Sequence, residues 1–220
     1  MGGVAAGESI VIPVVEGQIA ADLRVPERAI GLVIFAHGSG SSRFSSRNRA
    51  VAEFLEARGC GTLLLDLLTN EEEAIDVHTR EYRFDIERLG RRVVLATDWA
   101  HQRPDLKRLP VGSFGASTGA AAALIGAAER PAVTRAVVSR GGRPDLAGRA
   151  LANVQAPTLL IVGGDDEPVI EMNRDAIRQM AAPVELEIIP GATNLFEEPG
   201  TLEQVMELAT AWFHRHFAGA

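Results

Sequence analysis

The sequence has a single cysteine, Cys60, among 220 residues. One thiol excludes an intramolecular disulfide and any metal site built from several cysteines. Cys60 stands at the start of an apolar run that is typical of a strand, so we expect it to be buried as a small hydrophobic side chain.

Long hydrophobic runs are missing as well. The longest apolar runs are far too short to cross a bilayer, and residues 1–10 lack the basic stretch and apolar core that mark a secretory signal. Ala6 stands where an N-myristoylation pattern needs Ser or Thr. From these absences we expect a cytoplasmic protein that does not engage a membrane.

An excess of positive charge is also absent. The 22 Lys and Arg residues are outnumbered by 29 Asp and Glu residues, which gives a net charge of -7. Nucleic-acid binding needs a basic face, so we expect no nucleic-acid partner. The length and the ordinary balance of hydrophobic and charged residues predict that residues 1–220 form one domain, without indicating an oligomeric state.

Hydrophobic patterning predicts an α/β fold. Residues 9–15 and 18–25, separated by the turn signal Glu16-Gly17, are typical of an antiparallel hairpin. After Pro26, apolar runs alternate with segments of helical period, and such runs suit strands buried on both faces of a parallel sheet. The runs are residues 31–36, 62–65, 109–114, 133–139, 158–162 and 184–189.

The intervening segments are predicted to be helices. Residues 82–100 and 202–217 each place their apolar side chains on one stripe. Alternation of strands and helices indicates a doubly wound, mostly parallel sheet with right-handed crossovers. Together with the antiparallel hairpin at the front, this pattern favours the α/β-hydrolase architecture. The short segment between residues 139 and 157 leaves no room for a cap domain.

One motif suggests a nucleophile. Residues 115–119 read Gly-Ala-Ser-Thr-Gly, which matches G-x-S-x-G, after an apolar run and before the helix-forming residues 119–128. A strand-to-helix elbow needs glycine on both sides of the serine because its backbone is strained and crowded. Ser117 would then project at a helix N-terminus, where amide dipoles favour a developing anion. The alternative is a helix cap with tight glycine packing.

A second glycine-rich loop would complete an oxyanion hole. Residues 37–40 read His-Gly-Ser-Gly after the apolar run 31–36. In an elbow site the amide after the nucleophile, here Thr118, is joined by an amide of this loop, which we assign to Ser39. We expect His37 to hold the loop rather than act as a base. A dinucleotide-binding loop is excluded, because Arg43 stands where a third glycine is needed.

An acid follows the run 158–162, where residues 163–166 read Gly-Gly-Asp-Asp. The chain order serine, acid, histidine places the triad acid after this strand, and we assign it to Asp166 rather than Asp165. The alternative is a pair of turn-forming aspartates. The histidine should follow the last strand, where residues 190–199 read Pro-Gly-Ala-Thr-Asn-Leu-Phe-Glu-Glu-Pro.

Here the sequence resembles a known family. Residues 112–124, 139–145, 159–166 and 191–200 are similar, nearly letter for letter, to segments of the small, capless α/β-hydrolases of the dienelactone hydrolase type, some of which are fused to phosphoribosyltransferases. The resemblance covers essentially the whole chain. In that pattern a histidine stands at position 194, so Asn194 departs from the family at the catalytic base.

The resemblance implies a serine hydrolase scaffold for small carboxylic esters or lactones, with no metal and no organic cofactor. Asn194 could still hydrogen-bond both Ser117 and Asp166, but a carboxamide has no usable basicity near neutral pH, and turnover should fall by about 10⁴ to 10⁶. Asn194 is compatible with a natural or an engineered change. The alternative function is a non-catalytic binding or regulatory module that keeps the pocket.

Three further side chains are candidates for the site. His78, in a loop-like stretch beside an acidic run, could replace the missing base or could be a solvated loop histidine. Arg140 and Arg143 follow another strand at the same edge of the sheet. Their guanidinium groups could bind a substrate carboxylate or could brace the loop against nearby acids.

Overall fold

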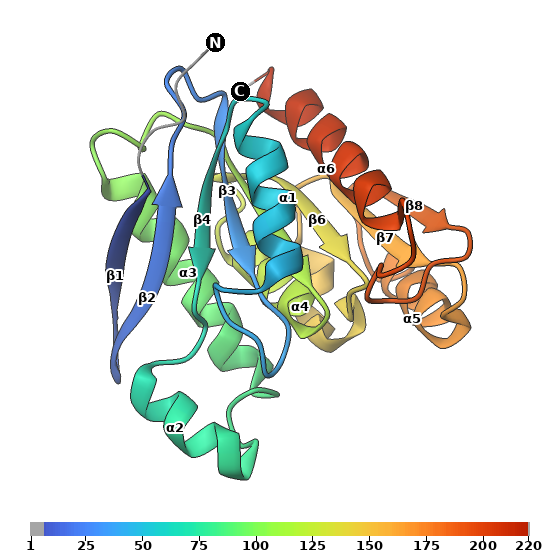
Figure 1. Cartoon of the computed structure of the whole chain (residues 1–220), viewed down its shortest axis with the longest axis horizontal. Helices are drawn as coiled ribbons and strands as arrows, with labels where there is room; N and C mark the ends of the chain where they lie inside the picture. The colour runs from blue at the N-terminus through green and yellow to red at the C-terminus, as the bar shows by residue number, and fades with distance from the viewer. Residues whose placement is uncertain (1–6, 220) are drawn as a thin grey trace.

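Residues 7–219 are described by a computed structural model, in which eight strands form one sheet (Figure 1). Residues 1–6, part of the stretch in which no signal pattern was found, lie outside the described residues. The elements are β1 (Glu8–Val14), β2 (Gly17–Arg24), β3 (Gly31–Ala36), α1 (Ser46–Glu56), β4 (Cys60–Leu65), α2 (Asn70–Thr79), α3 (Ile86–Gln102), β5 (Val111–Ala116), α4 (Thr118–Glu129), β6 (Thr134–Arg140), the 3-10 helix η1 (Pro144–Asn153), β7 (Thr158–Gly163), α5 (Glu167–Ile177), β8 (Val184–Ile189) and α6 (Thr201–Phe217).

The sheet is mostly parallel and has the order β1-β2-β4-β3-β5-β6-β7-β8. Its antiparallel part is the front, where β1 pairs with β2 and β2 pairs with β4. The α/β-hydrolase fold with an N-terminal hairpin is therefore confirmed. The hairpin turn is formed by Val15 and Glu16, one residue earlier than predicted, because Gly17 already pairs with Val14.

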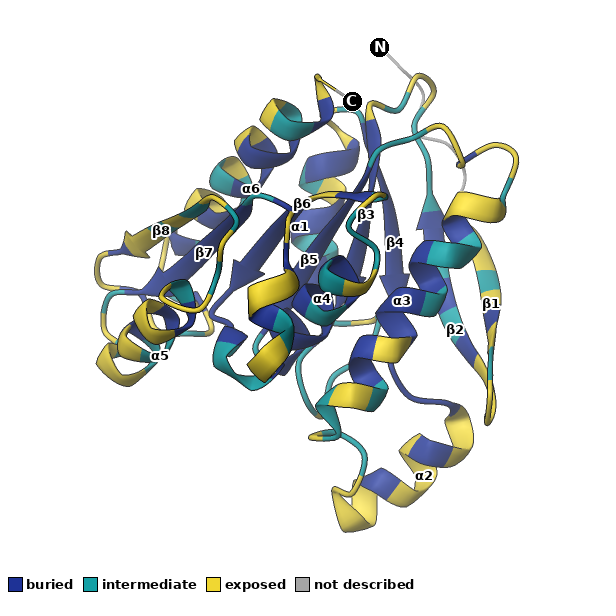
Figure 2. Cartoon of the chain, turned by 180° about the vertical axis from the view of Figure 1, so that it is seen from behind, coloured by how far each residue is buried: buried dark blue, intermediate teal, exposed yellow. Residues whose placement is uncertain are grey.

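Helices cover both faces of the sheet. α1 and α6 lie on the face shown in Figure 1, and α3, α4 and α5 lie on the opposite face shown in Figure 2. Phe35, Phe114 and Phe213 belong to the core under α1 and α6. Strands β3, β4, β5 and β7 are buried throughout, as apolar runs inside a parallel sheet require.

Strand β8 differs from the prediction that every apolar run is buried on both faces. It is an edge strand that shows exposed residues along its length (Figure 2). Glu185 and Glu187 are among these exposed residues. Charged side chains on an edge strand discourage pairing with a second chain.

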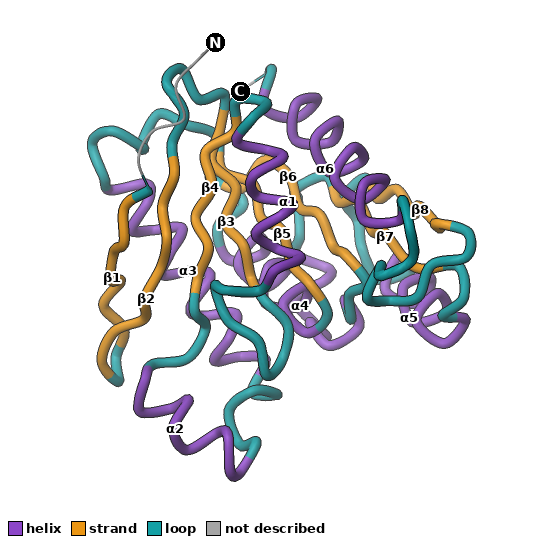
Figure 3. The backbone as a smooth tube through the Cα atoms, in the orientation of Figure 1, coloured by secondary structure: helices purple, strands orange, loops and turns teal. Residues whose placement is uncertain are grey.

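The carboxyl ends of the parallel strands lie at one edge of the sheet, and within residues 7–219 no cap domain covers it. Between β6 and β7 the chain forms only η1, a short 3-10 segment. The helix α2 projects from the end of the sheet at which β3 and β4 terminate (Figure 3). Loops that follow the parallel strands therefore meet at an edge without a covering domain.

Two helical boundaries were not predicted. α2 begins with a capping box between Thr69 and Glu72, a local signal that the apolar periodicity does not reveal. α3 begins at Ile86 rather than at Tyr82, because the buried carboxylate of Asp76 accepts hydrogen bonds from the amides of Tyr82 (2.7 Å) and Arg83 (2.9 Å). These bonds hold the residues before α3 in a turn.

The described part of the chain, residues 7–219, contains no helix with the length and apolarity that a membrane crossing requires.

The core under α6 should be sensitive to truncation. Phe213 is fully buried and stacks on Phe217, so Phe213→Ala should lower the free energy of unfolding by about 3–5 kcal/mol, measured by urea denaturation. Phe84→Ala is the matched control, because Phe84 is 58% exposed; it should change the free energy by less than about 0.5 kcal/mol. Equal losses in the two variants would contradict this account of the core.

Candidate active site

Ser117 lies at a sharp turn between β5 and α4. Its backbone has φ 51° and ψ -123°, a conformation that costs a residue with a side chain about 1–3 kcal/mol. Although Ser117 is the N-cap residue of α4, its side chain makes no capping hydrogen bond. The half-buried hydroxyl therefore does not cap the N-terminus of α4. This removes the main support for the alternative in which Ser117 serves only as a helix cap.

The glycines on both sides of Ser117 are required by close contacts. A Cβ atom on Gly115 would lie 2.4 Å from the Cα of Ala120, and one on Gly119 would lie 2.2 Å from the carbonyl oxygen of Ala36. Any side chain at either position would collide with backbone that cannot easily move. The G-x-S-x-G spacing is thus a packing requirement of the elbow.

The loop after β3 lies directly against the serine. A Cβ atom on Gly38 would be 3.1 Å from the Cβ of Ser117. Ser39 follows Gly38, and Thr118 begins α4, where the first amides of a helix have no acceptor within the helix. The structure therefore brings together the two segments that carry the predicted oxyanion amides.

His37 fixes this loop in place. Its Nδ1 lies 2.8 Å from the carbonyl oxygen of Gly38, and its Nε2 accepts a hydrogen bond of 3.1 Å from the amide of Leu67. Burial lowers the pKa of His37, which favours the neutral ring that this pair of bonds requires. Both ring nitrogens are engaged, so His37 is not free to act as a base, in agreement with the role expected from the sequence.

Backbone contacts connect the loops after β5, β6 and β8. The amide of Ser117 donates to the carbonyl oxygen of Arg140 (3.3 Å), and the amide of Arg143 donates to that of Ser117 (3.1 Å). Next along the chain, a Cβ atom on Gly141 would lie 2.4 Å from the carbonyl oxygen of Asn194. Gly141 has φ 50°, so both its conformation and this contact favour glycine.

The loop after β7 joins the same set of segments. The amide of Asp165 donates to the carbonyl oxygen of Ala192 (3.0 Å). Asp166 is half-buried and is the N-cap residue of α5, where its side chain makes no capping hydrogen bond, whereas Asp165 is exposed. Among residues 7–219 no hydrogen bond joins the side chains of Ser117, Asp166 and Asn194; the structure brings their backbone segments together.

The two arginines differ. Arg143 forms two hydrogen bonds with the carboxylate of Asp145, at 2.9 and 2.8 Å, which brace the loop. Arg140 is 6% exposed and donates from Nη2 to the side-chain oxygen of Asn48 (3.2 Å), while its Nε and Nη1 have no partner among the described residues. Burial, followed by the nearby charge of Arg47, lowers the pKa of Arg140 to about 10. No sequence pattern signalled this isolation.

The remaining histidines lie elsewhere. His78 is exposed on α2, not in a loop as the sequence suggested. His101 is in the last turn of α3. His214 lies 3.0 Å from the carbonyl oxygen of Arg58, beyond the C-terminal end of α1, and His216 packs against Trp212. Within residues 7–219, no hydrogen bond connects any of these four rings with the elbow.

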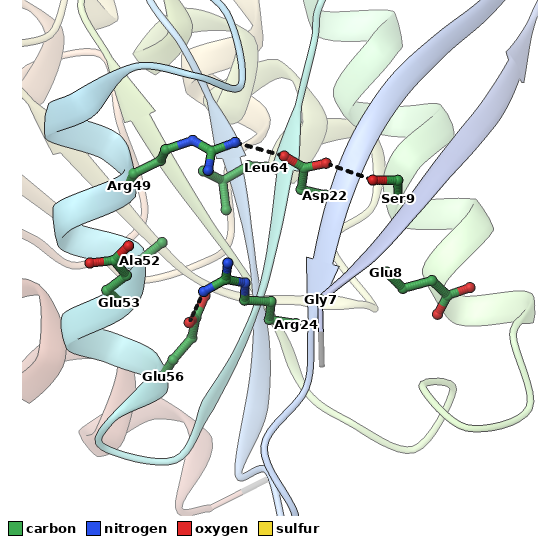
Figure 4. Close-up of a pocket in the computed structure, with 10 residues that line it drawn as sticks. All are labelled: Gly7, Glu8, Ser9, Asp22, Arg24, Arg49, Ala52, Glu53, Glu56 and Leu64. Atoms are coloured by element: carbon green, nitrogen blue, oxygen red, sulfur yellow. Dashed lines mark hydrogen bonds and ion pairs between the residues drawn. The ribbon is translucent and has the colours of Figure 1, made fainter. Parts of the chain in front are cut away.

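A separate depression of about 210 Å³ lies between β2 and α1 (Figure 4). Two ion pairs line it: Arg49 with Asp22 at 2.9 Å, and Arg24 with Glu56 at 3.6 Å. None of its lining residues belongs to the elbow, to the Gly-Gly-Asp-Asp loop or to the Asn194 loop. This depression is therefore not part of the candidate active site.

Two other kinds of site lack support within the described part of the chain. No group of three or more His, Cys, Asp or Glu side chains there is arranged to hold a metal ion. Cys60 is buried, as expected, and burial raises the pKa of its thiol to about 12, which makes it a poor nucleophile.

Comparisons with known proteins agree with this fold. The sequence profile of the dienelactone hydrolase family matches residues 20–216. The crystal structure of a dienelactone hydrolase from Anabaena variabilis is 56% identical, with a TM-score of 0.94 over 96% of this chain and 98% of that chain. Est1E from Butyrivibrio proteoclasticus shares the fold, with a TM-score of 0.78 and 18% identity over 96% of this chain and 99% of that chain.

The curated relatives are longer proteins. Two Mycobacterium tuberculosis proteins, from strains CDC 1551 and H37Rv and provisionally named as phosphoribosyl transferases, are each 57% identical over 201 residues. The match covers 91% of this chain but 44% of theirs. The chain therefore spans less than half the length of the curated relatives that it matches.

The environment of His37 predicts a dependence of stability on pH. Because burial lowers its pKa in the folded state, the unfolded chain binds the proton more readily below pH 6.5. As the pH is lowered below that value, the free energy of unfolding should decrease by up to about 1.4 kcal/mol per pH unit. Urea denaturation of the unmodified chain and of His37→Gln between pH 7.5 and 5.5 should show a shallower dependence in the variant. Parallel curves would refute this role.

Proposed function

The chain belongs to the dienelactone hydrolase family, and from that membership we propose that it is a serine hydrolase scaffold for small carboxylic esters or lactones, impaired by Asn194. We further propose that the chain forms one domain, lies in the cytoplasm and acts on a small molecule. Neither a metal nor an organic cofactor is needed, and neither nucleic acid nor a membrane is a partner.

The conformation of Ser117 carries the proposal. A strained backbone persists only where the surrounding structure enforces it, and such residues cluster at functional sites. Here strand packing and two crowded glycines enforce it, and the hydroxyl is left without a capping hydrogen bond at the N-terminus of α4. This arrangement suits a nucleophile, because the N-terminus of α4 favours the negative charge that develops when the hydroxyl attacks a carbonyl group.

The proposed reaction is acyl transfer. The Oγ of Ser117 attacks the substrate carbonyl carbon, and the amides of Ser39 and Thr118 donate to the oxygen that becomes negative. The ester C–O bond then breaks and the alcohol leaves with the proton from Ser117; water next cleaves the acyl-enzyme, which releases the carboxylic acid and restores the serine hydroxyl. Asp166 would orient a base at position 194. Asn194 can accept a hydrogen bond but not the proton that Ser117 must release, so both acylation and attack by water on the acyl-enzyme are slowed.

A binding or regulatory module is the second candidate. It is favoured by Asn194 itself and by the absence, among residues 7–219, of a hydrogen bond between its side chain and Ser117. A third possibility, His78 as a displaced base, requires that the unmodified chain turns over and that His78→Ala abolishes the turnover.

The name of the curated relatives gives no support for a transferase function of this chain. It describes proteins more than twice as long as the matched region, and the matched region coincides with the hydrolase family profile. The elbow around Ser117 supports hydrolysis rather than transfer of a phosphoribosyl group.

Restoring the base is the direct test. Asn194→His should raise the rate of hydrolysis of 4-nitrophenyl acetate and butyrate by about 10³-fold or more, because a neutral imidazole accepts the Ser117 proton. The rate is measured by release of 4-nitrophenolate near neutral pH.

Two controls accompany this test. The double variant Asn194→His with Ser117→Ala should return to the background rate, and Asn194→Gln should gain nothing because it supplies no base. If Asn194→His shows no gain while the protein stays folded, the hydrolase proposal is wrong and the binding module is favoured.

A further inference from the structure

The first turn of α1 has an unusual charge. It begins at Ser46 and continues with Arg47, Asn48 and Arg49, and it contains no acidic residue. The N-terminus of a helix carries partial positive charge, so arginines there are unfavourable unless a negative group lies close by. The balance of charge at this turn therefore depends on carboxylates from other segments.

Two arginines near this turn are paired with carboxylates of the protein, and a third is paired only with an exposed carboxylate. Arg43 pairs with Asp66, and Arg49 pairs with Asp22 at 2.9 Å. Arg47 pairs at 3.0 Å with Glu197, whose side chain is 63% exposed. An exposed pair of this kind contributes little and is easily displaced by another anion.

Arg140 has no carboxylate partner at all among residues 7–219. Arg140 is the last residue of β6 and lies on the same face of the sheet as Ala136 and Val138, which belong to the core under α1. Its Nη2 donates a hydrogen bond to the side chain of Asn48 in the first turn of α1. Its Nε and Nη1 are buried without partners in that part of the chain. Burying an unpaired guanidinium group costs free energy, and proteins keep such groups mainly at sites where function requires them.

This cationic cluster adjoins the candidate active site. The carbonyl oxygen of Arg140 accepts the amide hydrogen of Ser117 (3.3 Å), and Glu197 belongs to the same loop as Asn194. A group bound by Arg140 and Arg47 would therefore lie beside the segments that carry Ser117 and Asn194.

We propose that Arg140, Arg47 and the first turn of α1 form a binding site for a phosphate group carried by the ester substrate. A phosphate monoester is close to a dianion near neutral pH, which matches two guanidinium groups. The amides of Ser46 and Arg47 at the start of α1 are suited to its oxygens, whereas the amide of Asn48 already donates to the Oγ of Ser45. On binding, the phosphate replaces the carboxylate of Glu197 on Arg47. The substrate assignment rests on the proposed function, whereas the anion site itself does not.

The anion site is tested with inorganic phosphate and the whole, otherwise unmodified chain. Titration by calorimetry and by thermal unfolding, with sodium chloride at matched ionic strength as the reference, should show saturable binding and a rise in Tm. Arg140→Met should weaken binding by about tenfold or more. Without phosphate its Tm should stay equal or rise, because an unpaired buried charge is removed.

Surface variants keep the test decisive if Arg140→Met folds poorly. Arg47→Gln should weaken phosphate binding, and Glu197→Gln should strengthen it by removing the internal competitor. Arg215→Gln is the matched control, because Arg215 is an exposed arginine paired with Glu185 on β8, and it should leave binding unchanged. No saturable binding, or binding by Arg140→Met and Arg47→Gln equal to that of the unmodified chain, would overturn the site.

The substrate assignment is tested separately in the Asn194→His background. The ratio of kcat/KM for 1-acetylglycerol 3-phosphate to that for 1-acetylglycerol should be about ten or more, mainly through KM, and should approach one when Arg140→Met is added. A ratio near one with intact phosphate binding would show that the site holds a free anion, and would overturn the substrate assignment. If Asn194→His is inactive on every ester, the proposed function fails, while the titrations still decide the anion site.

Discussion

The crowding of backbone around Ser117 is the constraint on which the site depends. Strand β5 ends between β3 and β6, and α4 begins so close to them that Gly115 and Gly119 cannot carry side chains. In this space the chain turns through the positive φ of Ser117, and the serine side chain does not cap the helix. The strain of the Ser117 backbone is maintained by this packing.

The neighbouring loops depend on the same crowding. His37 bonds to Leu67, just beyond the end of β4, which holds the loop containing Ser39 against the elbow. On the other side, Gly141 allows the Asn194 loop to approach β6. At position 194 this packing involves the backbone carbonyl oxygen, so it does not depend on the identity of the side chain there. Among the described residues, Arg140 is buried with a charge that no carboxylate of the fold balances.

Much of this architecture could be predicted from local sequence, and the limits have clear causes. β3 and β8 begin and end where their apolar runs do, and the elbow is recognisable because G-x-S-x-G follows such a run. α2 was missed because its signal is a capping box rather than an apolar stripe. The partners of His37 and the isolation of Arg140 depend on Leu67 and Asn48, which are 30 and 92 positions away, and no local pattern encodes such contacts.

The most direct test of the central claim is a high-resolution crystal structure of Asn194→His after reaction with a fluorophosphonate. We predict phosphorus bonded to the Oγ of Ser117, with its unsubstituted oxygen about 2.7–3.1 Å from the amide nitrogens of Ser39 and Thr118. The imidazole introduced at position 194 should lie between Ser117 and Asp166. An adduct on another residue, or an oxygen that points to solvent away from both amides, would contradict the assignment of this site.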